Sequence, residues 1–235
     1  MPEVLGRLRG GLIVSVQAPA GSALDDPAVL TALALGAQEA GACGLRIQGA
    51  ANIRAARKKV RVSTVGIVKR DYAGFEPYIT PTALEVRELL ETGTDIIALD
   101  ATGRVRPDGS SLADLVAAIH AGGALAMADC ATADDALCAR AAGADILATT
   151  LCGYTKETAG HALPALDLVR HMSQLDGFVI CEGGIASPQS GREAIVAGAH
   201  AIVVGTAITN VEWLTRSFVS ALAPSNVVAR EDAFP

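Results

Sequence analysis

Four segments of the chain repeat one pattern of polar and apolar positions. EAGACGLRI, ETGTDIIAL, AAGADILAT and VAGAHAIVV each end a helix-like stretch, place a glycine and begin an apolar run. A glycine directly after a helix can take the left-handed conformation that satisfies the last carbonyls, so these glycines are predicted helix C-caps. They are Gly41, Gly93, Gly143 and Gly198. The apolar run after each glycine is predicted to be a buried parallel strand.

The whole chain contains eight such runs. They are LIVSV from residue 12, CGLRI from 43, STVGIV from 63, DIIALD from 95, ALAMAD from 124, DILAT from 145, FVICE from 178 and AIVVG from 201. Strands that alternate with helix-length segments over short connections predict an α/β fold, a closed (β/α)8 TIM barrel. An open doubly wound sheet is the main alternative, but its usual G-x-G-x-x-G is missing after the first strand.

Composition supports one barrel domain. The chain has 235 residues, and such a barrel typically needs about 250. Apolar residues make up 51% and aromatic residues only 3%, so the core must be built from Ala, Val, Leu and Ile, which suits buried parallel strands. No change in composition divides the chain. We expect a single domain over residues 1–223 and a loosely ordered tail over residues 224–235.

Several classes of function are disfavoured. The formal net charge of −6 argues against nucleic-acid binding, and the basic cluster at 54–61 is expected at a solvated helix C-terminus. No run approaches the roughly 18 apolar residues of a membrane span. The five cysteines are scattered without a C-x-x-C, which disfavours disulfides and zinc and favours the cytoplasm. The four histidines show no ligand spacing, so we expect no metal.

Polar side chains stand near the end of almost every predicted strand, where barrels carry their chemistry. They are Gln17, Arg46, Lys69, Asp100, Asp129, Thr149, Thr150 and Glu182, with Gly205 at the eighth strand. A single polar strand end is ordinary, because exposed ends are commonly polar. A nearly complete ring that includes acids and a lysine indicates a site for proton transfer.

Two glycine-containing turns follow the last two strands. Glu182-Gly183-Gly184 comes after the seventh strand, and Gly205-Thr206 after the eighth. Barrels often hold a phosphate between these two loops, on bare backbone N–H groups. Tight turns alone are the alternative reading. No dinucleotide or P-loop motif is present, so the residues favour a cofactor-free proton transfer on a small sugar phosphate.

Eight motifs together are similar to one known family. GIVKRDY, ITPT (79–82), DIIALDAT (95–102), RPDG (106–109), MADC (127–130), TTLCGYT (149–155), EGGI (182–185) and VVGTAIT (203–209) resemble N-acetylmannosamine-6-phosphate 2-epimerases, from about residue 12 to 220. The resemblance implies a barrel of the ribulose-phosphate-binding type. It also implies interconversion of N-acetylmannosamine 6-phosphate and N-acetylglucosamine 6-phosphate in sialic acid catabolism, without a cofactor, by a homodimer.

The resemblance also implies roles for individual residues. Lys69 matches the catalytic lysine and Glu182 the catalytic glutamate. The sugar and its acetamido group would be held by Gln17, Arg46, Asp129 and Tyr154, and we add Thr150 as a substrate contact. The phosphate would rest on Gly183, Gly184, Gly205 and Thr206. Many family members have arginine where Gly184 stands, and arginine-proline where Asn210 and Val211 stand, so this chain must rely on backbone amides or another cation.

Lys69 can act as a base only when it is neutral, and free lysine has a pKa near 10.4. Desolvation and a nearby Arg46 are expected to lower that pKa. Glu182 is expected to be partly protonated or aimed at the sugar hydroxyls. A one-residue scheme, in which Lys69 serves both faces of carbon 2, and a two-residue scheme both stay open.

Several secondary expectations concern the surroundings of this site. Arg70 and Asp71 are expected to pair and to fix the loop of Lys69. Trp213 and Phe218 are expected to cover the outside of the barrel or a second chain, and Cys130 and Cys152 to be buried thiols. The rival functions are a metal-dependent pentulose-phosphate 3-epimerase and an inactive sugar-phosphate sensor.

Overall fold

The computed structural model describes residues 3–19 and 21–222. Eight parallel strands form a closed barrel in chain order, and the last strand pairs with the first. The strands are β1 (Leu12–Val16), β2 (Gly44–Gln48), β3 (Ser63–Ile67), β4 (Ile96–Asp100), β5 (Leu125–Asp129), β6 (Ile146–Ala148), β7 (Phe178–Glu182) and β8 (Ala201–Val204). Each coincides with one of the eight apolar runs, so the predicted TIM barrel is confirmed.

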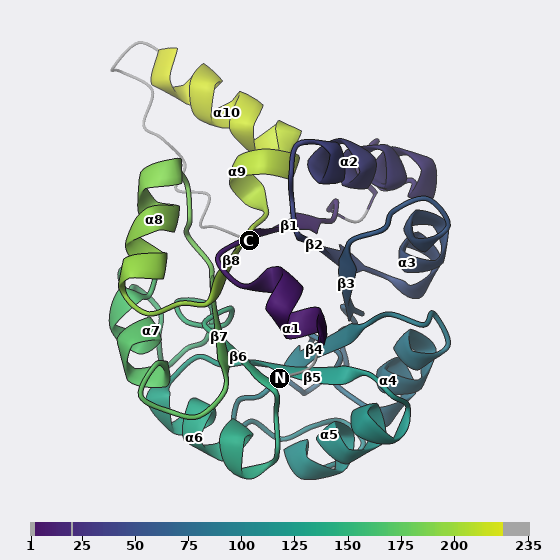
Figure 1. Cartoon of the computed structure of the whole chain (residues 1–235), viewed down its shortest axis with the longest axis vertical. Helices are drawn as coiled ribbons and strands as arrows, with labels where there is room; N and C mark the ends of the chain where they lie inside the picture. Colours follow the sequence, from purple (N-terminus) through teal and green to yellow (C-terminus); the bar gives the residue numbers. More distant parts are fainter. Residues whose placement is uncertain (1–2, 20, 223–235) are drawn as a thin grey trace.

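The helices form a ring around these strands (Figure 1). They are α2 (Pro27–Glu39), α3 (Ala50–Arg57), α4 (Ala83–Leu90), α5 (Leu112–Ala121), α6 (Ala133–Ala141), α7 (Leu166–Met172) and α8 (Pro188–Val196). Two more, α9 (Thr206–Thr209) and α10 (Val211–Leu222), follow β8. The repeat of strand and helix directs all eight C-terminal strand ends to one face of the barrel.

Local capping explains where these helices begin and end. Four helices start with a capping box, in which a hydroxyl and an acidic or serine side chain satisfy the first backbone N–H groups; the capping residues are Thr82, Ser111, Thr132 and Ser187. The predicted C-cap glycines Gly41, Gly93, Gly143 and Gly198 have φ of 101°, 69°, 90° and 114°. These values confirm the left-handed conformation that the sequence pattern predicted.

A short helix closes the N-terminal end of the barrel. Helix α1 (Glu3–Leu8) lies across the centre of the ring of strands in Figure 1. Its Leu5 and Leu8 are buried in one apolar cluster with Ile13, Ile96 and Phe178, which stand near strand starts. Helix α1 was not predicted from the sequence, because its six residues are too few to show a helical period.

Helix α10 projects from the barrel beside α2 (Figure 1). None of its residues is buried, and Phe218, Val219 and Leu222 are 71%, 63% and 85% exposed. The expected domain end at residue 223 and the expected tail over 224–235 lie outside the described residues.

Candidate active site

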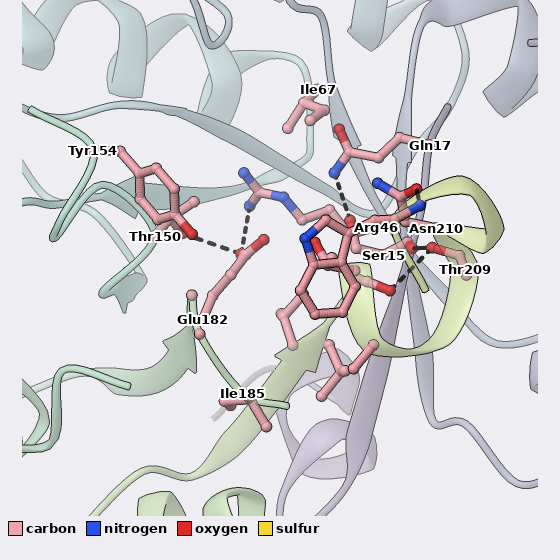
Figure 2. A pocket seen from close by; sticks show the side chains of 18 of the residues that line it. Ser15, Gln17, Arg46, Ile67, Thr150, Tyr154, Glu182, Ile185, Thr209 and Asn210 are labelled. Atoms are coloured by element: carbon pink, nitrogen blue, oxygen red, sulfur yellow. Dashed lines mark hydrogen bonds and ion pairs between the residues drawn. The ribbon is translucent and has the colours of Figure 1, made fainter. Parts of the chain in front are cut away.

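A cavity of about 240 Å³ opens at the C-terminal end of the strands. Its walls contain all but one of the predicted site residues: Gln17, Arg46, Lys69, Thr150, Tyr154, Glu182, Gly183, Gly184, Gly205 and Thr206. Figure 2 shows Arg46, Thr150 and Glu182 pointing toward one another on one side, with Gln17 and Asn210 on the other. The exception, Asp129, lies behind this wall.

Arg46 is the central charge of the site. It stands in the middle of β2, not at its end, and only 1% of its surface is exposed. Its Nη2 lies 2.6 Å from Oδ2 of Asp129, and its Nη1 lies 3.2 Å from Oδ1 of Asp129 and 3.2 Å from Oε2 of Glu182. A guanidinium fork matches a carboxylate in this two-point way. The fold therefore buries an ion pair directly below the cavity.

Asp129 contacts other protein groups and not the cavity. It is fully buried at the end of β5, and its carboxylate receives Arg46 and the hydroxyl of Thr150. Asp100 likewise turns away, since its carboxylate is bonded by Thr102 and Arg104. The expected ring of strand-end side chains is thus incomplete. The closed barrel permits only some strand-end side chains to point inward.

Two adjacent threonines position Glu182. Oγ1 of Thr149 donates to the Glu182 carbonyl at 2.8 Å and accepts from the Glu182 N–H at 3.0 Å. Oγ1 of Thr150 lies 3.1 Å from Oε2 of Glu182 (Figure 2). Thr149 lies outside the cavity wall, whereas Thr150 forms part of it. The last residue of β7 is therefore fixed at both its backbone and its side chain.

Lys69 lies two residues beyond β3 and is held by its own loop. An isolated antiparallel bridge joins it to Ile79, which brings the ring of Tyr78 to 5.9 Å from Nζ. Among the described residues no side chain accepts a hydrogen bond from Nζ. Lys69 as a residue is exposed at the open mouth, but its amine stands among the atoms of the cavity wall. Its pKa is lowered from the ordinary value, first by desolvation and then by Arg46, while Glu182 and Asp129 oppose this.

Burial raises the pKa of Glu182 above its ordinary value, and the Asp129 charge adds to this effect. Arg46 and Lys69 act in the opposite direction, as does Thr150 when its hydroxyl donates to Glu182. Its side chain is 12% exposed. The pKa of Tyr154, which lies on the same side of the cavity as Glu182 (Figure 2), is also raised by burial and by Glu182. The pKa values of Lys69 and Glu182 are therefore both displaced in the direction that favours the neutral form.

Another part of the cavity wall is made of backbone. Gly183 and Gly184 have φ of 101° and 69°, which glycine alone adopts without strain. No described group accepts a hydrogen bond from the backbone N–H of Gly183, Gly184, Gly205 or Thr206. A Cβ on Gly184 would stand 2.3 Å from Cβ of Leu163, so this position has no room for a side chain. Unpaired N–H groups around a concave surface suit an anion.

The loop that carries Lys69 is anchored differently from the expected pairing. Arg70 bonds Glu85 and also Glu88 at 3.1 Å, so it does not pair with Asp71. Glu85 is fully buried and accepts further hydrogen bonds from Tyr72 and Thr82. The position of Lys69 therefore depends on helix α4. Asp71, which follows Arg70 in the sequence, takes no part in the contact of Arg70 with α4.

Sequence reasoning missed several cavity residues. Tyr78, Ser15 and Thr209 line the wall, and so does Trp213, which was expected on the outside of the barrel or against a second chain. Oδ1 of Asn210 accepts from the N–H of Trp213 at 2.9 Å and so caps α10. No short motif marks these residues, because closure of the barrel brings Ser15 and Tyr78 to the cavity, and the turn between α9 and α10 brings Thr209 and Trp213 to it.

The cysteines are all free thiols. Cys130 and Cys152 are buried, as predicted, and burial raises the pKa of each. The fold brings His161 to Cys152, with 3.9 Å between Nδ1 and Sγ, although the two are nine residues apart. A thiol with a raised pKa is a poor nucleophile.

Comparison with known proteins shows the family. Residues 30–224 match the family described as "Putative N-acetylmannosamine-6-phosphate epimerase". The chain belongs to this family. A Synechococcus elongatus protein called "Putative N-acetylmannosamine-6-phosphate 2-epimerase" is 42% identical over 94% of this chain and 97% of its own length. A Brucella melitensis "Bifunctional enzyme NanE/NanK" is 45% identical over 98% of this chain but only 45% of its own length.

A solved structure agrees with these relatives. The N-acetylmannosamine-6-phosphate 2-epimerase from Clostridium perfringens superposes with a TM-score of 0.90 at 39% identity, over 93% of this chain and 96% of that one.

Within residues 3–19 and 21–222, no cluster of three or more acidic, histidine or cysteine side chains could hold a metal ion. No helix in the same part of the chain is long and apolar enough to cross a membrane.

Proposed function

We propose that this chain is an N-acetylmannosamine-6-phosphate 2-epimerase, which moves a proton at carbon 2 to interconvert N-acetylmannosamine 6-phosphate and N-acetylglucosamine 6-phosphate. The single observation that carries the proposal is one cavity that contains both the amine of Lys69 and backbone N–H groups, each without a hydrogen-bond acceptor among the described residues. The first suits proton abstraction, and the second suits the phosphate of the same molecule. Such a step belongs to the catabolism of sialic acid.

Lys69 is the proposed base. Removal of the carbon 2 proton requires an open chain with an aldehyde at carbon 1, because the carbonyl stabilises the resulting enolate. The lowered pKa of Lys69 increases the neutral fraction of the amine near pH 7. The positive guanidinium of Arg46, in the wall beside it, stabilises the negative charge of the enolate.

Glu182 is the proposed acid. Its raised pKa increases the protonated fraction near pH 7, so it can return a proton to carbon 2 or assist ring opening. In a two-residue scheme Lys69 and Glu182 act on opposite faces. In a one-residue scheme Lys69 serves both faces while the enolate rotates.

The remaining wall residues are proposed to hold the substrate. Gln17, Arg46, Thr150 and Tyr154 provide donors and acceptors for the sugar and its acetamido group. Asp129, which the walls hide, acts by orienting Arg46. The phosphate is proposed to rest on the backbone N–H groups of Gly183, Gly184, Gly205 and Thr206, with no arginine at position 184.

The proposal is tested by mixing the purified chain with N-acetylmannosamine 6-phosphate and following the carbon 1 proton signals by NMR. We expect conversion to N-acetylglucosamine 6-phosphate. Binding without conversion, or no interaction at all, would refute the epimerase. The same reaction in deuterium oxide separates the two schemes: full retention of the original carbon 2 hydrogen eliminates a separate exchanging acid.

The chain is further proposed to form a homodimer through α10. The apolar side chains of Phe218, Val219 and Leu222 are exposed on this helix, and exposed apolar patches of this kind mark association surfaces. Sedimentation equilibrium of the intact chain should give twice the chain mass. Phe218→Asp should give monomers, whereas the control Ser220→Asp should not. A monomeric intact chain contradicts this proposal.

We also propose a cytoplasmic location. Five unpaired thiols, of which Cys138 is exposed, suit a reducing compartment. Cell fractionation with an antibody against the chain should recover it with cytoplasmic marker enzymes.

A further inference from the structure

The hydroxyl of Thr150 lies between two carboxyl groups. Its Oγ1 is 2.7 Å from Oδ1 of Asp129 and 3.1 Å from Oε2 of Glu182. A hydroxyl has one hydrogen to donate, and an ionised carboxylate can only accept. If both carboxyls were ionised, one of these contacts would place two oxygens together with no hydrogen between them. All contacts are satisfied when one of the two carboxyls carries a proton.

The distances show which carboxyl carries it. Asp129 accepts from both Nη atoms of Arg46, at 3.2 and 2.6 Å, and has the shorter contact with Thr150. Short, charge-assisted bonds of this kind favour the ionised acceptor. Glu182 has a single guanidinium contact, at 3.2 Å. The hydroxyl of Thr150 therefore donates its hydrogen bond to Asp129, and Glu182 is the carboxyl group that is protonated.

We propose that Thr150 is a positioning residue that keeps the catalytic proton on Glu182. Oε2–H of Glu182 donates to Oγ1 of Thr150, whose own hydrogen is donated to Oδ1 of Asp129. The consequence for catalysis rests on the proposed function: with Glu182 neutral, no ionised carboxylate in the cavity wall favours protonation of Lys69. The buried charges of Arg46 and Asp129 then balance, which a desolvated site requires.

Glu182 faces charged and titratable groups from several elements. They are Arg46 on β2, Lys69 after β3, Asp129 on β5, Tyr154 in the loop after β6, and Cys181 beside it on β7. Two described groups touch both acids: the guanidinium of Arg46, which can only donate, and the hydroxyl of Thr150, which can donate or accept. A hydroxyl that donated to Glu182 would lower its pKa, whereas one that accepts from it raises the pKa. Removal of the hydroxyl therefore raises the pKa of Glu182 if Thr150 donates to it, and lowers this pKa if Thr150 accepts from it.

The experiment compares Thr150→Val, which keeps the shape and removes the hydroxyl, with Thr150→Ser, which keeps the hydroxyl. Infrared spectra of the unliganded chain are recorded across about pH 4 to 9, and Glu182→Gln identifies the carboxylic acid band of Glu182. We expect the valine variant to lower the protonation midpoint of Glu182 by about one pH unit, the scale of one hydrogen bond. The serine variant should keep the original midpoint. An unchanged or raised midpoint in the valine variant overturns the proposal.

Turnover provides a second readout. The valine variant should lower kcat at pH 7 by about tenfold, because a smaller fraction of the sites has neutral Glu182. KM should rise only through the lost substrate contact of Thr150. Serine should restore most of the rate. A purely structural role would lower Tm or raise KM and leave the infrared midpoint in place, which overturns the proposal. If the valine variant does not fold, Thr150→Ala is expected to shift the midpoint in the same direction.

The infrared measurement needs no substrate. A chain that shows the shift but no epimerisation therefore retains the proton assignment and loses the proposed function.

Discussion

At the N-terminal end of the barrel, α1 lays Leu5 and Leu8 over the strand starts, whereas at the C-terminal end the strands bury Arg46, Asp129 and Glu182. The first end is an apolar plug with Phe178 stacked on His200, at 5.0 Å between ring centroids. The second is a polar cavity whose ion pairs are costly to bury. Stability is therefore concentrated at one end of the same strands and chemistry at the other.

The largest predicted effect is at the mouth. Lys69→Met should lower kcat by at least about 10³-fold, because it removes the only proposed base, while the folded barrel remains. Lys156→Met is the matched control, since this lysine is 90% exposed and pairs with Glu76 away from the cavity wall; its turnover should match that of the parent chain. Undiminished turnover in Lys69→Met contradicts the proposed mechanism.

The next effect is at the plug. Leu8 is fully buried, so Leu8→Ala should lower the free energy of unfolding by about 2–5 kcal/mol. The kcat of the folded fraction should not change, because Leu8 is at the opposite end from the cavity. Urea unfolding and NMR turnover measure the two quantities. Val196→Ala, at a position 82% exposed, should change neither. A loss of kcat in Leu8→Ala without a loss of stability contradicts the assignment of stability to one end of the barrel and of chemistry to the other.

A smaller effect is predicted in the backbone wall. Gly184→Ala should raise KM by about tenfold, because a Cβ at φ of 69° costs on the order of 1–2 kcal/mol and also meets Leu163. Gly109→Ala is the control: Gly109 has φ of 72° but no atom within 4 Å of its Cβ position. It carries the same backbone strain without the contact. Equal KM values for both variants and the parent chain exclude a role for this wall in binding.

The smallest effect concerns pH and stability. Lys69 has a lowered pKa in the folded chain, so the folded state binds fewer protons than the unfolded state. Stability from this group therefore rises with pH through the lowered pKa and levels off near the unfolded value of about 10.4. Thermal unfolding should show Lys69→Met gaining most in Tm over the parent chain at pH 6, with the gain shrinking toward pH 10. A gain independent of pH contradicts the lowered pKa.

The repeated glycine and apolar pattern predicted the strands because both signals are local. Gly41 and its three counterparts end helices through their own backbone conformation, and each following run is buried whatever its partner. The rule that barrels place chemistry at strand C-termini then located Lys69 and Glu182. The sequence could also predict the glycine wall, because φ is a property of single residues.

The contacts inside the site were beyond local reasoning. Arg46 and Asp129 are 83 residues apart, and their pairing depends on closure of the barrel. Asp100 and Asp129 occupy equivalent strand ends, yet one turns to Arg104 and the other to Arg46. Arg70 prefers Glu85, on α4, to the adjacent Asp71. Each choice depends on side-chain packing between elements distant in the chain.

The contact between Leu163 and Gly184 limits the order in which this protein can change. With 2.3 Å between the Leu163 Cβ and a Cβ placed at 184, an arginine introduced there alone meets a wall that has no space for it. A smaller residue at 163 must come first. The resulting variant has a gap beside Gly183 and Gly184 and gains no positive charge that would compensate for the lost packing. Arginine at 184 therefore requires two substitutions in this chain, at 163 and at 184, and the order in which they are made matters.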